Sequence, residues 1–308
     1  MNAHTLHDHA RHFGWNRDNA PALTVAPGDR IAVPCADASG GQITRDSDVT
    51  AISALKPERA NPLSGPIHVD GAEPGDALAV RIESLAPSGW GWTANIPGFG
   101  LLANDFPDPH LIISRHDETR VDFLGGIRLP VRPFIGTIGV APAEAGTHPV
   151  IPPYRTGGNM DCRDLVAGAT LWLPVAVPGA LLSLGDTHVA QGDGEVCGTA
   201  IEAAMDVALR IELHKGAAPA SPMLEVPPGP LRSEHDAGFV VTTGIGPDLM
   251  EAAREAVRRL IEQITRRYRL DPADAYCLAS VAADLRISEI VDAPNWMVSA
   301  YLPKAIVA

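Results

Sequence analysis

Ionisable side chains and glycines are concentrated between residues 185 and 195, where the sequence reads Gly-Asp-Thr-His-Val-Ala-Gln-Gly-Asp-Gly-Glu. Asp186 and His188 are two residues apart, so an extended backbone would direct both side chains to the same side. Divalent cations accept carboxylate oxygens and imidazole nitrogens as ligands, and a hydrolytic ion also needs an open position for water. The spacing indicates a metal site, although on its own it also fits an Asx-type turn with a surface histidine.

Glu195 stands at the border between this polar turn and an apolar stretch, residues 199–213. A carboxylate at such a border is partly removed from water, which raises its pKa toward the range of a general base. The alternative is a glutamate in the first turn of a helix, where the helix dipole favours a negative charge.

A second polar turn, residues 157–164, reads Gly-Gly-Asn-Met-Asp-Cys-Arg-Asp. Asn159 could orient a substrate carbonyl, and Asp161 could bind a metal ion or fix a histidine. Local capping of the turn is the alternative for both residues. His12 and Asp37, nearer the N-terminus, are further candidates, although a lone histidine is also typical of a packed or surface position.

Three large aromatic residues, Trp90, Trp92 and Phe99, lie among glycines in one segment. This composition predicts an aromatic, mobile wall over a small pocket, or alternatively a surface loop that packs its own aromatic side chains.

The sequence contains no GxSxG, P-loop or HExxH motif, so an acyl-enzyme route loses support. Cys197 follows the glycine-rich turn and is the remaining candidate nucleophile, with His188 as the basic residue near it in sequence. The four cysteines are widely spaced without a CxxC pair, which favours buried free thiols.

Strand, Pro-Gly turn, strand is a pattern that occurs three times, in residues 22–35, 67–87 and 170–186. Apolar residues alternate on both sides of each turn. In the first unit we expect Leu23 and Val25 to face a core together with residues across a hairpin-like connection. These units favour a β-sandwich or barrel-like core over a parallel α/β sheet, which would need helices between its strands.

The pattern changes after Lys215. Residues 216–231 are rich in proline and small residues and predict a linker or an irregular surface crossing. Apolar residues spaced three or four apart then predict a helix over about 248–269. Asp271 followed by proline predicts the start of a shorter helix that ends at about Ala283.

The predicted fold is therefore α+β and β-rich. We expect a core of residues 1–215 that carries most of the active site, and a smaller α/β portion of residues 216–308 packed on it. Residues 286–292 and 296–304 are predicted to be closing strands.

Charge and hydropathy exclude some classes of protein. The formal net charge is -13, from 37 acidic and 24 basic residues, which disfavours nucleic acid and anionic lipid as partners. No apolar run reaches the ~18 to 20 residues that span a bilayer, and the first residues lack the apolar core of a secretory signal. We expect a cytoplasmic protein without a membrane partner.

Several long segments together resemble the acetamidase/formamidase family. These segments are HFGWN, DASGGQI, GPIHVDGAEPGD, GWGWTANIPGFGLLANDF, VIPPYRTGGNMD and VPGALLSLGDTHVAQGDGEVCGTAIE, and they extend over nearly the entire chain. The resemblance implies an amidohydrolase that releases ammonia from small linear amides such as formamide or acetamide. It also implies a β-rich fold, a homo-oligomer and a divalent metal, with zinc expected and calcium as the alternative.

The residues carried over by this resemblance are His12, Asp37, Asn159, Asp161, Asp186, His188, Gln191, Asp193 and Glu195. Together with Trp92 and Phe99 from the aromatic segment, we expect them to fall into three groups. The metal ligands would come from His12, Asp37, Asp161, Asp186 and His188; the catalytic residues would be Glu195, Asn159 and Gln191; substrate contacts would come from Trp92, Phe99 and Asp193. Glu195 would take a proton from water and return it to departing ammonia, while Asn159 or Gln191 would stabilise the oxyanion. Two alternatives stay open: an acyl-enzyme amidase that uses Cys197, and a non-catalytic β-sandwich that binds small molecules.

Overall fold

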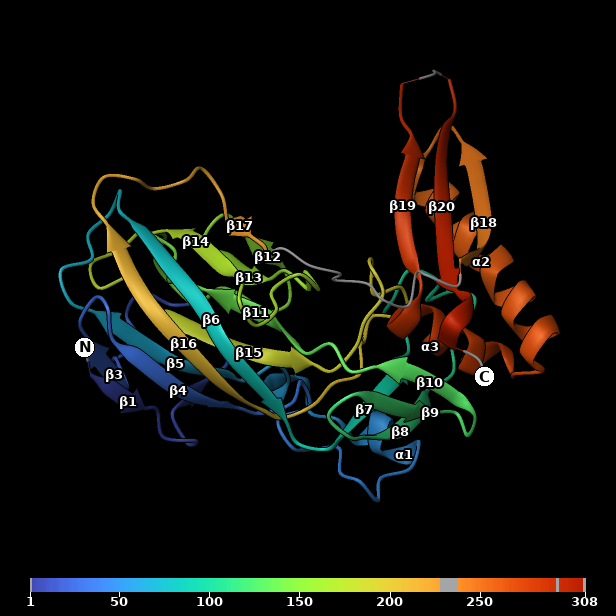
Figure 1. Ribbon diagram of the computed structural model, residues 1–308, viewed down its shortest axis with the longest axis horizontal. Helices are drawn as coiled ribbons and strands as arrows, with labels where there is room; N and C mark the ends of the chain where they lie inside the picture. Colours follow the sequence, from blue (N-terminus) through green and yellow to red (C-terminus); the bar gives the residue numbers. More distant parts are fainter. Residues whose placement is uncertain (1, 228–237, 292–293, 307–308) are drawn as a thin grey trace.

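The computed structural model describes residues 2–227, 238–291 and 294–306 of the 308. Within these ranges the chain forms four sheets and a few helices (Figure 1). The first sheet has the order β1-β4-β16-β6-β14-β17, with β1 Ala3–Thr5, β4 Arg30–Cys35, β16 Met205–His214, β6 Ala77–Pro87, β14 Thr170–Pro174 and β17 Met223–Glu225. The second has the order β12-β13-β11-β15-β5-β2, with β12 Pro153–Tyr154, β13 Gly157–Asn159, β11 Phe134–Gly139, β15 Leu182–His188, β5 Leu63–Val69 and β2 Arg11–His12, and β3 Leu23–Val25 also pairs with β5.

The other two sheets are smaller. One has the order β10-β9-β8-β7, with β10 Ile127–Pro130, β9 Arg120–Phe123, β8 His110–His116 and β7 Trp90–Asn95. The other has the order β18-β20-β19, with β18 Phe239–Gly246, β20 Trp296–Pro303 and β19 Asp284–Glu289. The helices are α1 Thr50–Ala54, η1 Pro57–Arg59, α2 Leu249–Tyr268, α3 Pro272–Ala282 and η3 Lys304–Ile306.

The first two sheets form a β-sandwich. Their apolar side chains belong to one buried cluster, with Val80 and Leu209 from one sheet and Ile135 and Leu184 from the other. Burial alternates along β4, as expected for a strand with one face in a core. The prediction of a β-rich α+β fold with a sandwich core is thus confirmed.

The Pro-Gly turns connect the two layers of this sandwich. β3 pairs with β5 of the second sheet, whereas β4 pairs with β16 of the first. The same change of sheet occurs between β5 and β6 and between β14 and β15. The predicted hairpin-like connection is therefore wrong: the flanking strands do not pair with each other, because their apolar residues meet across the core rather than side by side.

The C-terminal elements pack on the four-stranded sheet. A buried cluster includes Phe123 and Leu129 of that sheet, Leu260 of α2 and Tyr276 of α3. In Figure 1 the strands β18, β19 and β20 stand beside α2, apart from the sandwich, with α3 between them and β7–β10. α3 thus occupies the junction between the C-terminal sheet and the rest of the chain.

Both predicted helices are present, with helix starts set by capping side chains. Asp248 accepts a hydrogen bond from the backbone of Glu251 at the start of α2, and Asp271 accepts one from Ala273 at the start of α3. The predicted linker, residues 216–231, contains β17, which pairs with β14; residues 228–231 lie outside the described residues. No helix in the described ranges is long and apolar enough to cross a membrane.

Candidate functional site

Neighbouring strands of the second sheet bring the two predicted polar turns together. β11 lies between β13 and β15 and is hydrogen-bonded to both. Asn159 ends β13, Asp161 follows it by two residues, and Asp186 and His188 occupy the end of β15. One ligand atom each of Asp161, Asp186 and His188 lie within 4.8 Å of one another. Sheet pairing therefore accounts for the convergence of these side chains.

A second group of ligand atoms, from His188, Glu195 and Glu202, also lies within 4.8 Å. The backbone of Glu202 pairs with both Trp92 and His188, which holds this residue between two strands. Its side chain is buried, and Oε2 lies 3.1 Å from Nε2 of His188. Glu202 is not among the site residues predicted from the sequence, although a carboxylate within an otherwise apolar stretch is a signal for it.

Hydrogen bonds from the following loop orient the imidazole of His188. Its Nδ1 donates to Oε1 of Gln191 at 2.9 Å, and Nε2 of Gln191 donates to the carbonyl oxygen of Asp161 at 2.9 Å. Because a carbonyl oxygen can only accept, the second bond shows that the NH₂ group of Gln191 points to Asp161 and its oxygen points to His188. The Nδ1 atom of His188 must therefore carry a proton. Nε2 of His188 then faces Asp186, whose Oδ1 lies 3.2 Å away.

Three of the clustered carboxylates stand on left-handed backbone. The φ angles are 45° at Asp161, 50° at Asp186 and 42° at Glu195. This region disfavours side chains other than glycine, and each such residue costs about 1 to 2 kcal/mol. Such backbone is often found at functional sites, where the surrounding structure enforces it.

Gly136 of β11 provides the space in which the cluster assembles. A Cβ at this position would lie 2.6 Å from the carbonyl oxygen of Asp186, 2.7 Å from Oδ1 of Asp161 and 2.9 Å from Cε1 of His188. All three distances are shorter than ordinary contacts, so any larger residue would displace the site. Gly136 is not among the site residues predicted from the sequence.

Opposite charges pair at the centre of the cluster. Burial acts to lower the pKa of His188, but the carboxylates of Glu202 and Asp186 raise it well above its usual value. Burial acts to raise the pKa of Asp186, but the nearby imidazolium and its hydrogen bond lower it below the usual value. Both shifts favour the charged forms of His188 and Asp186 in the protein without a bound cation.

The other carboxylates hold protons more tightly than usual. Burial, with the charge of Asp186, raises the pKa of Asp161 to about 7. Burial, with the charge of Asp161, raises the pKa of Glu195 well above its usual value. Burial raises the pKa of Glu202 to about 8, against the opposing effect of His188. Four carboxyl groups around one imidazole require additional positive charge before all of them can ionise.

The cluster fits a divalent cation. Oδ1 of Asp161 and Oε2 of Glu202 are buried and receive no hydrogen bond of acceptable geometry from the described residues. Oε2 of Glu202 nevertheless lies 3.1 Å from Nε2 of His188. Buried acceptors normally have partners, and carboxylate oxygens with one imidazole nitrogen are a donor set that borderline cations bind.

A cavity of about 720 Å³ lies beside the cluster. Asn159, Asp161, Asp186, Glu195 and Glu202 contribute to its lining. Trp92 and Phe99 line the same cavity, together with aliphatic residues from three other segments. A pocket of this size can hold a small-molecule substrate next to the ionisable groups.

Asn159 is positioned between the cluster and the cavity. Its Oδ1 accepts a hydrogen bond from Thr137, and its Nδ2 donates to Oδ2 of Asp161 at 2.9 Å. The same hydroxyl of Thr137 also lies 3.2 Å from Oδ2 of Asp186, the second acceptor within its reach. This network fixes both carboxylates and leaves the second N–H of Asn159 to meet a ligand.

Two predicted metal ligands lie outside the groups of converging ligand atoms. The ring nitrogens of His12 contact the carbonyl oxygen of Gly14 and the hydroxyl of Ser183, each at 2.9 Å. Oδ1 of Asp37 accepts from the backbone of Ser39 at 2.8 Å and from Nε1 of Trp92 at 3.0 Å. The second set of bonds connects the N-terminal turn to the aromatic wall of the cavity.

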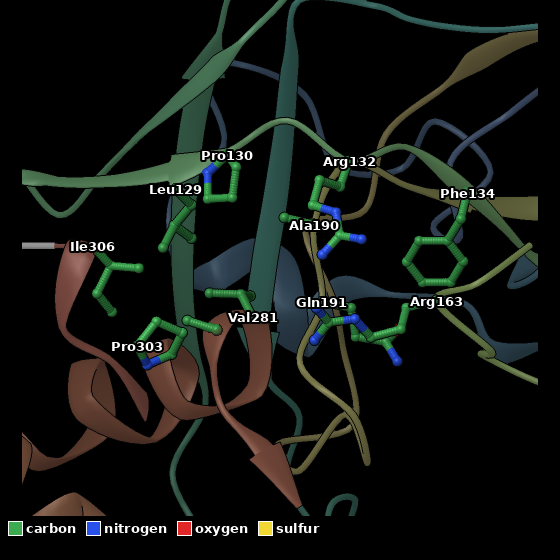
Figure 2. Close-up of a pocket in the computed structure, with 11 residues that line it drawn as sticks. Leu129, Pro130, Arg132, Phe134, Arg163, Ala190, Gln191, Val281, Pro303 and Ile306 are labelled. Atoms are coloured by element: carbon green, nitrogen blue, oxygen red, sulfur yellow. The ribbon is translucent and has the colours of Figure 1, made fainter. Parts of the chain in front are cut away.

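Asp193 and Gln191 do not line the large cavity. The carboxylate of Asp193 lies 3.8 Å from Nε of Arg163, near the C-terminal elements. Gln191 instead lines a second cavity of about 20 Å³, next to Arg163 and Arg132 (Figure 2). Val281, Pro303 and Ile306 form the other side of this cavity. It has room for about one water molecule, so it is too small for a substrate.

Cys197 is fully buried and does not line the substrate cavity. Burial acts to raise the pKa of its thiol, but hydrogen bonds, first from Cys277 and then from Ser280, lower it to about 7. Sγ lies 3.5 Å from the carbonyl oxygen of Ala94. The thiol therefore faces the protein interior, where it contacts neither the cluster nor a substrate.

A buried cluster of carboxylates and an imidazole beside a cavity, on a β-sandwich, is the kind of site that hydrolases use. The sequence profile of the acetamidase/formamidase family matches residues 2–149 and 143–308. The chain belongs to this family, and it is an amidase, a hydrolase of the carbon–nitrogen bond of linear amides.

Relatives and solved structures agree with this membership. The formamidase of Methylophilus methylotrophus is 27% identical over 96% of this chain and 89% of its own. The gamma lactamase from Delftia acidovorans has a TM-score of 0.91 and 26% identity, over 99% of this chain and 93% of its own. The acetamidase from Yersinia enterocolitica has a TM-score of 0.68 and 34% identity, over 100% of this chain and 93% of its own.

Proposed function

We propose that the cluster around His188 hydrolyses small amides to a carboxylate and ammonia by metal-assisted attack of water. The convergence of Asp161, Asp186, Glu195, Glu202 and His188 beside one cavity carries this proposal. Similarity to acetamidases and formamidases supports formamide and acetamide as members of the substrate class.

Asp161, Asp186, His188 and Glu202 would hold the ion. A bound divalent cation would acidify a water molecule, polarise an amide carbonyl and supply the positive charge that the carboxylates lack. Because one ligand is an imidazole nitrogen, zinc suits the site better than calcium, which prefers oxygen ligands only. His12 and Asp37 are assigned to support instead: His12 bonds Ser183 of β15, and Asp37 bonds Trp92.

Glu195 is proposed as the general base and acid. It lines the cavity, and its raised pKa suits a group that accepts a proton from water and later donates it to the leaving nitrogen. In the overall reaction, amide and water give carboxylic acid and ammonia. A carboxylate oxygen of Glu195 takes one proton when water attacks the carbonyl carbon, and it returns that proton to the nitrogen when the C–N bond breaks.

Asn159 and Gln191 are proposed to have different roles. Asn159 lines the cavity and would donate its second N–H to the oxygen of the substrate carbonyl. Gln191 is a positioning residue, because both ends of its amide are used to hold His188 and the backbone of Asp161. Trp92 and Phe99 would contact the substrate, whereas Asp193 would stabilise the loop through Arg163.

Ammonia release from acetamide and formamide tests the proposal, with wild-type protein measured before and after chelation and after return of zinc. We expect activity to disappear on chelation, to return with zinc, and to fall on the order of 1,000-fold in Glu195→Gln. Activity that survives chelation in protein shown to lack stoichiometric metal would disprove the metal-assisted route.

The acyl-enzyme alternative predicts a covalent intermediate on Cys197. Hydroxylamine trapping together with a Cys197→Ser variant separates the two routes. Because Cys197 does not line the cavity, we expect no acyl hydroxamate above the metal-dependent background and only a modest loss of activity in the variant.

Two further properties are proposed. The four cysteines are free thiols, three of them buried, which supports a cytoplasmic location. Exposed apolar side chains on the C-terminal sheet, including Val241 and Ile245, support a homo-oligomer. Light scattering at low protein concentration measures the oligomeric state.

A further inference from the structure

The substrate cavity is much larger than acetamide. Its volume is about 720 Å³, whereas four non-hydrogen atoms occupy on the order of 100 Å³ when each takes about the volume of a water molecule. Cavities of roughly 300 to 1,000 Å³ enclose ligands with many more atoms. An amide that contacts the whole lining must therefore carry a substantial substituent.

The chemistry of the lining indicates what that substituent is. Apart from the cluster and a few neutral polar residues, the lining is hydrocarbon, with Leu55, Ala60, Ile96, Ile151 and Met160 among its members. These residues come from separate segments, so the apolar wall is assembled by the fold rather than by one local stretch. A hydrocarbon wall favours an apolar group over a polar one.

The mouth of the cavity is also apolar. Phe99 is 44% exposed and Ile151 is 47% exposed, and both line the cavity. A single exposed apolar residue is common on protein surfaces. Two that line the same cavity form an apolar surface that an apolar ligand would cover. Gly198, with φ +88°, contributes to this arrangement, because a Cβ there would lie 2.5 Å from the ring of Phe99.

Charge further restricts the substrate. No lysine or arginine belongs to the described residues that line the cavity, whereas four carboxyl groups do. When the amide group lies at the cluster, a carboxylate at the far end of the substrate would enter the apolar part of the cavity, where no described residue supplies a positive charge to pair with it. The lining therefore selects against anionic amides.

We propose that the preferred substrates are uncharged amides with a hydrocarbon group of about five or more carbons on the carbonyl, rather than formamide or acetamide. This inference rests on the proposed function, because it concerns the same site. The reaction is unchanged: the C–N bond breaks, water supplies the new C–O bond, and ammonia leaves.

The test is kcat/KM for ammonia release along the series acetamide, butyramide and hexanamide, with adipamate as the anionic analogue of hexanamide. Each buried methylene is expected to raise kcat/KM about fourfold, so hexanamide should exceed acetamide on the order of 100-fold. Adipamate should be at least about 100-fold poorer than hexanamide, because its buried carboxylate has no partner.

A variant of the wall locates the effect. Ala60→Trp fills the apolar part of the cavity and should reduce the ratio of hexanamide to acetamide kcat/KM by more than about tenfold. Ala60→Leu is the smaller change if the tryptophan variant does not fold. Ala217→Trp, at an exposed position that is not part of the lining, is the matched control and should leave the ratio unchanged.

The outcomes are distinguishable. If acetamide is hydrolysed as well as or better than hexanamide, or if adipamate equals hexanamide, the inference is overturned while the proposed function stands. If no amide in the series releases ammonia, both are overturned. A steep rise along the series that collapses only in the Ala60 variants supports both.

Discussion

Oε2 of Glu202 and Nε2 of His188 lie 3.1 Å apart, and neither side chain is more than 3% exposed. Glu202 follows the loop that begins at the end of β15, and the same loop contains Gln191, whose amide contacts the other ring nitrogen. Gln191 and Glu202 therefore contact the two different ring nitrogens of His188, which sets the orientation of the imidazole toward Asp186.

Replacement of Glu202 by glutamine tests whether its charge is needed. The change keeps the shape of the side chain and removes a carboxylate that faces His188 and the cavity. We expect kcat to fall on the order of 100-fold and zinc affinity on the order of 10-fold or more, measured by steady-state kinetics and competition with a chelator. Glu212→Gln, on the exposed side of β16, is the control. Wild-type kinetics and zinc affinity in Glu202→Gln would exclude Glu202 from the site.

Removal of the amide of Gln191 tests its positioning role. In Gln191→Leu the ring of His188 loses the acceptor for Nδ1, so we expect zinc affinity to fall about 10- to 100-fold and the pH profile of kcat to shift. KM for the amide should change little, because Gln191 does not line the substrate cavity. A variant with raised KM but normal zinc affinity would contradict this role. Gln263→Leu on α2 serves as the matched control.

A methyl group at Gly136 should displace the cluster. The Cβ of alanine would lie within 2.9 Å of atoms from Asp161, Asp186 and His188, all of which are proposed metal ligands. The atoms concerned include the carboxylate oxygen Oδ1 of Asp161 and a ring carbon of His188. We expect Gly136→Ala to lose more than about 100-fold in kcat and to bind zinc weakly, as titration would show. Gly126→Ala, where a Cβ meets no atom within 4 Å, should behave as wild type. Equal activity of the two variants would show that the strand yields without disturbing the site.

Much of this site could be predicted from sequence because three of its carboxylates stand close to glycines in polar segments. Asp161, Asp186 and Glu195 adopt left-handed backbone, and the glycines around them are the sequence sign of sharp turns. Which turns meet depends on β11 lying between β13 and β15, and this pairing is long-range. The family resemblance, rather than periodicity, indicated that the two turns act together.

Glu202 and Gly136 could not be identified in the same way. Each lies in a stretch whose residues mostly pack in a core, so composition predicts structure there. A lone carboxylate is the single sign of chemistry at position 202, and position 136 gives none. The Pro-Gly turns show a related limit. Alternation along a strand identifies the face that meets the core, but it does not identify the strand that pairs with it. A hairpin and a connection from one sheet to the other have the same alternation, as β3 and β4 illustrate.

Backbone strain at Glu195 has a measurable consequence. With φ at 42°, this position suits glycine better than alanine. We expect Glu195→Gly to be more stable than Glu195→Ala by about 1 kcal/mol, measured by denaturant unfolding, although both variants should be inactive. A comparison at Glu251, within α2, should give the opposite order, because glycine is unfavourable inside a helix. An alanine variant at position 195 as stable as the glycine variant would show that the loop relaxes its backbone.

The metal-free protein should lose stability as the pH rises. The folded-state pKa of Glu202 is about 8 against its ordinary 4.5, and that of Asp161 is about 7 against 3.8. Between the ordinary and the raised values the folded protein holds protons that the unfolded chain releases, so unfolding becomes easier with increasing pH. The raised pKa of His188 acts in the same direction, whereas the lowered pKa of Asp186 acts only at more acidic pH.

Thermal unfolding of chelator-treated protein at pH 5.5 and pH 8 measures this effect. We expect a lower melting temperature at pH 8, corresponding to on the order of 1 kcal/mol per pH unit, and a smaller difference in Glu202→Gln, which lacks one of the titrating groups. Zinc should reverse the trend, because its ligands bind only after they lose their protons and higher pH favours that loss. A metal-free protein that is more stable at pH 8 than at pH 5.5 would mean that the carboxylates are ionised without a cation, which would remove the electrostatic argument for the metal.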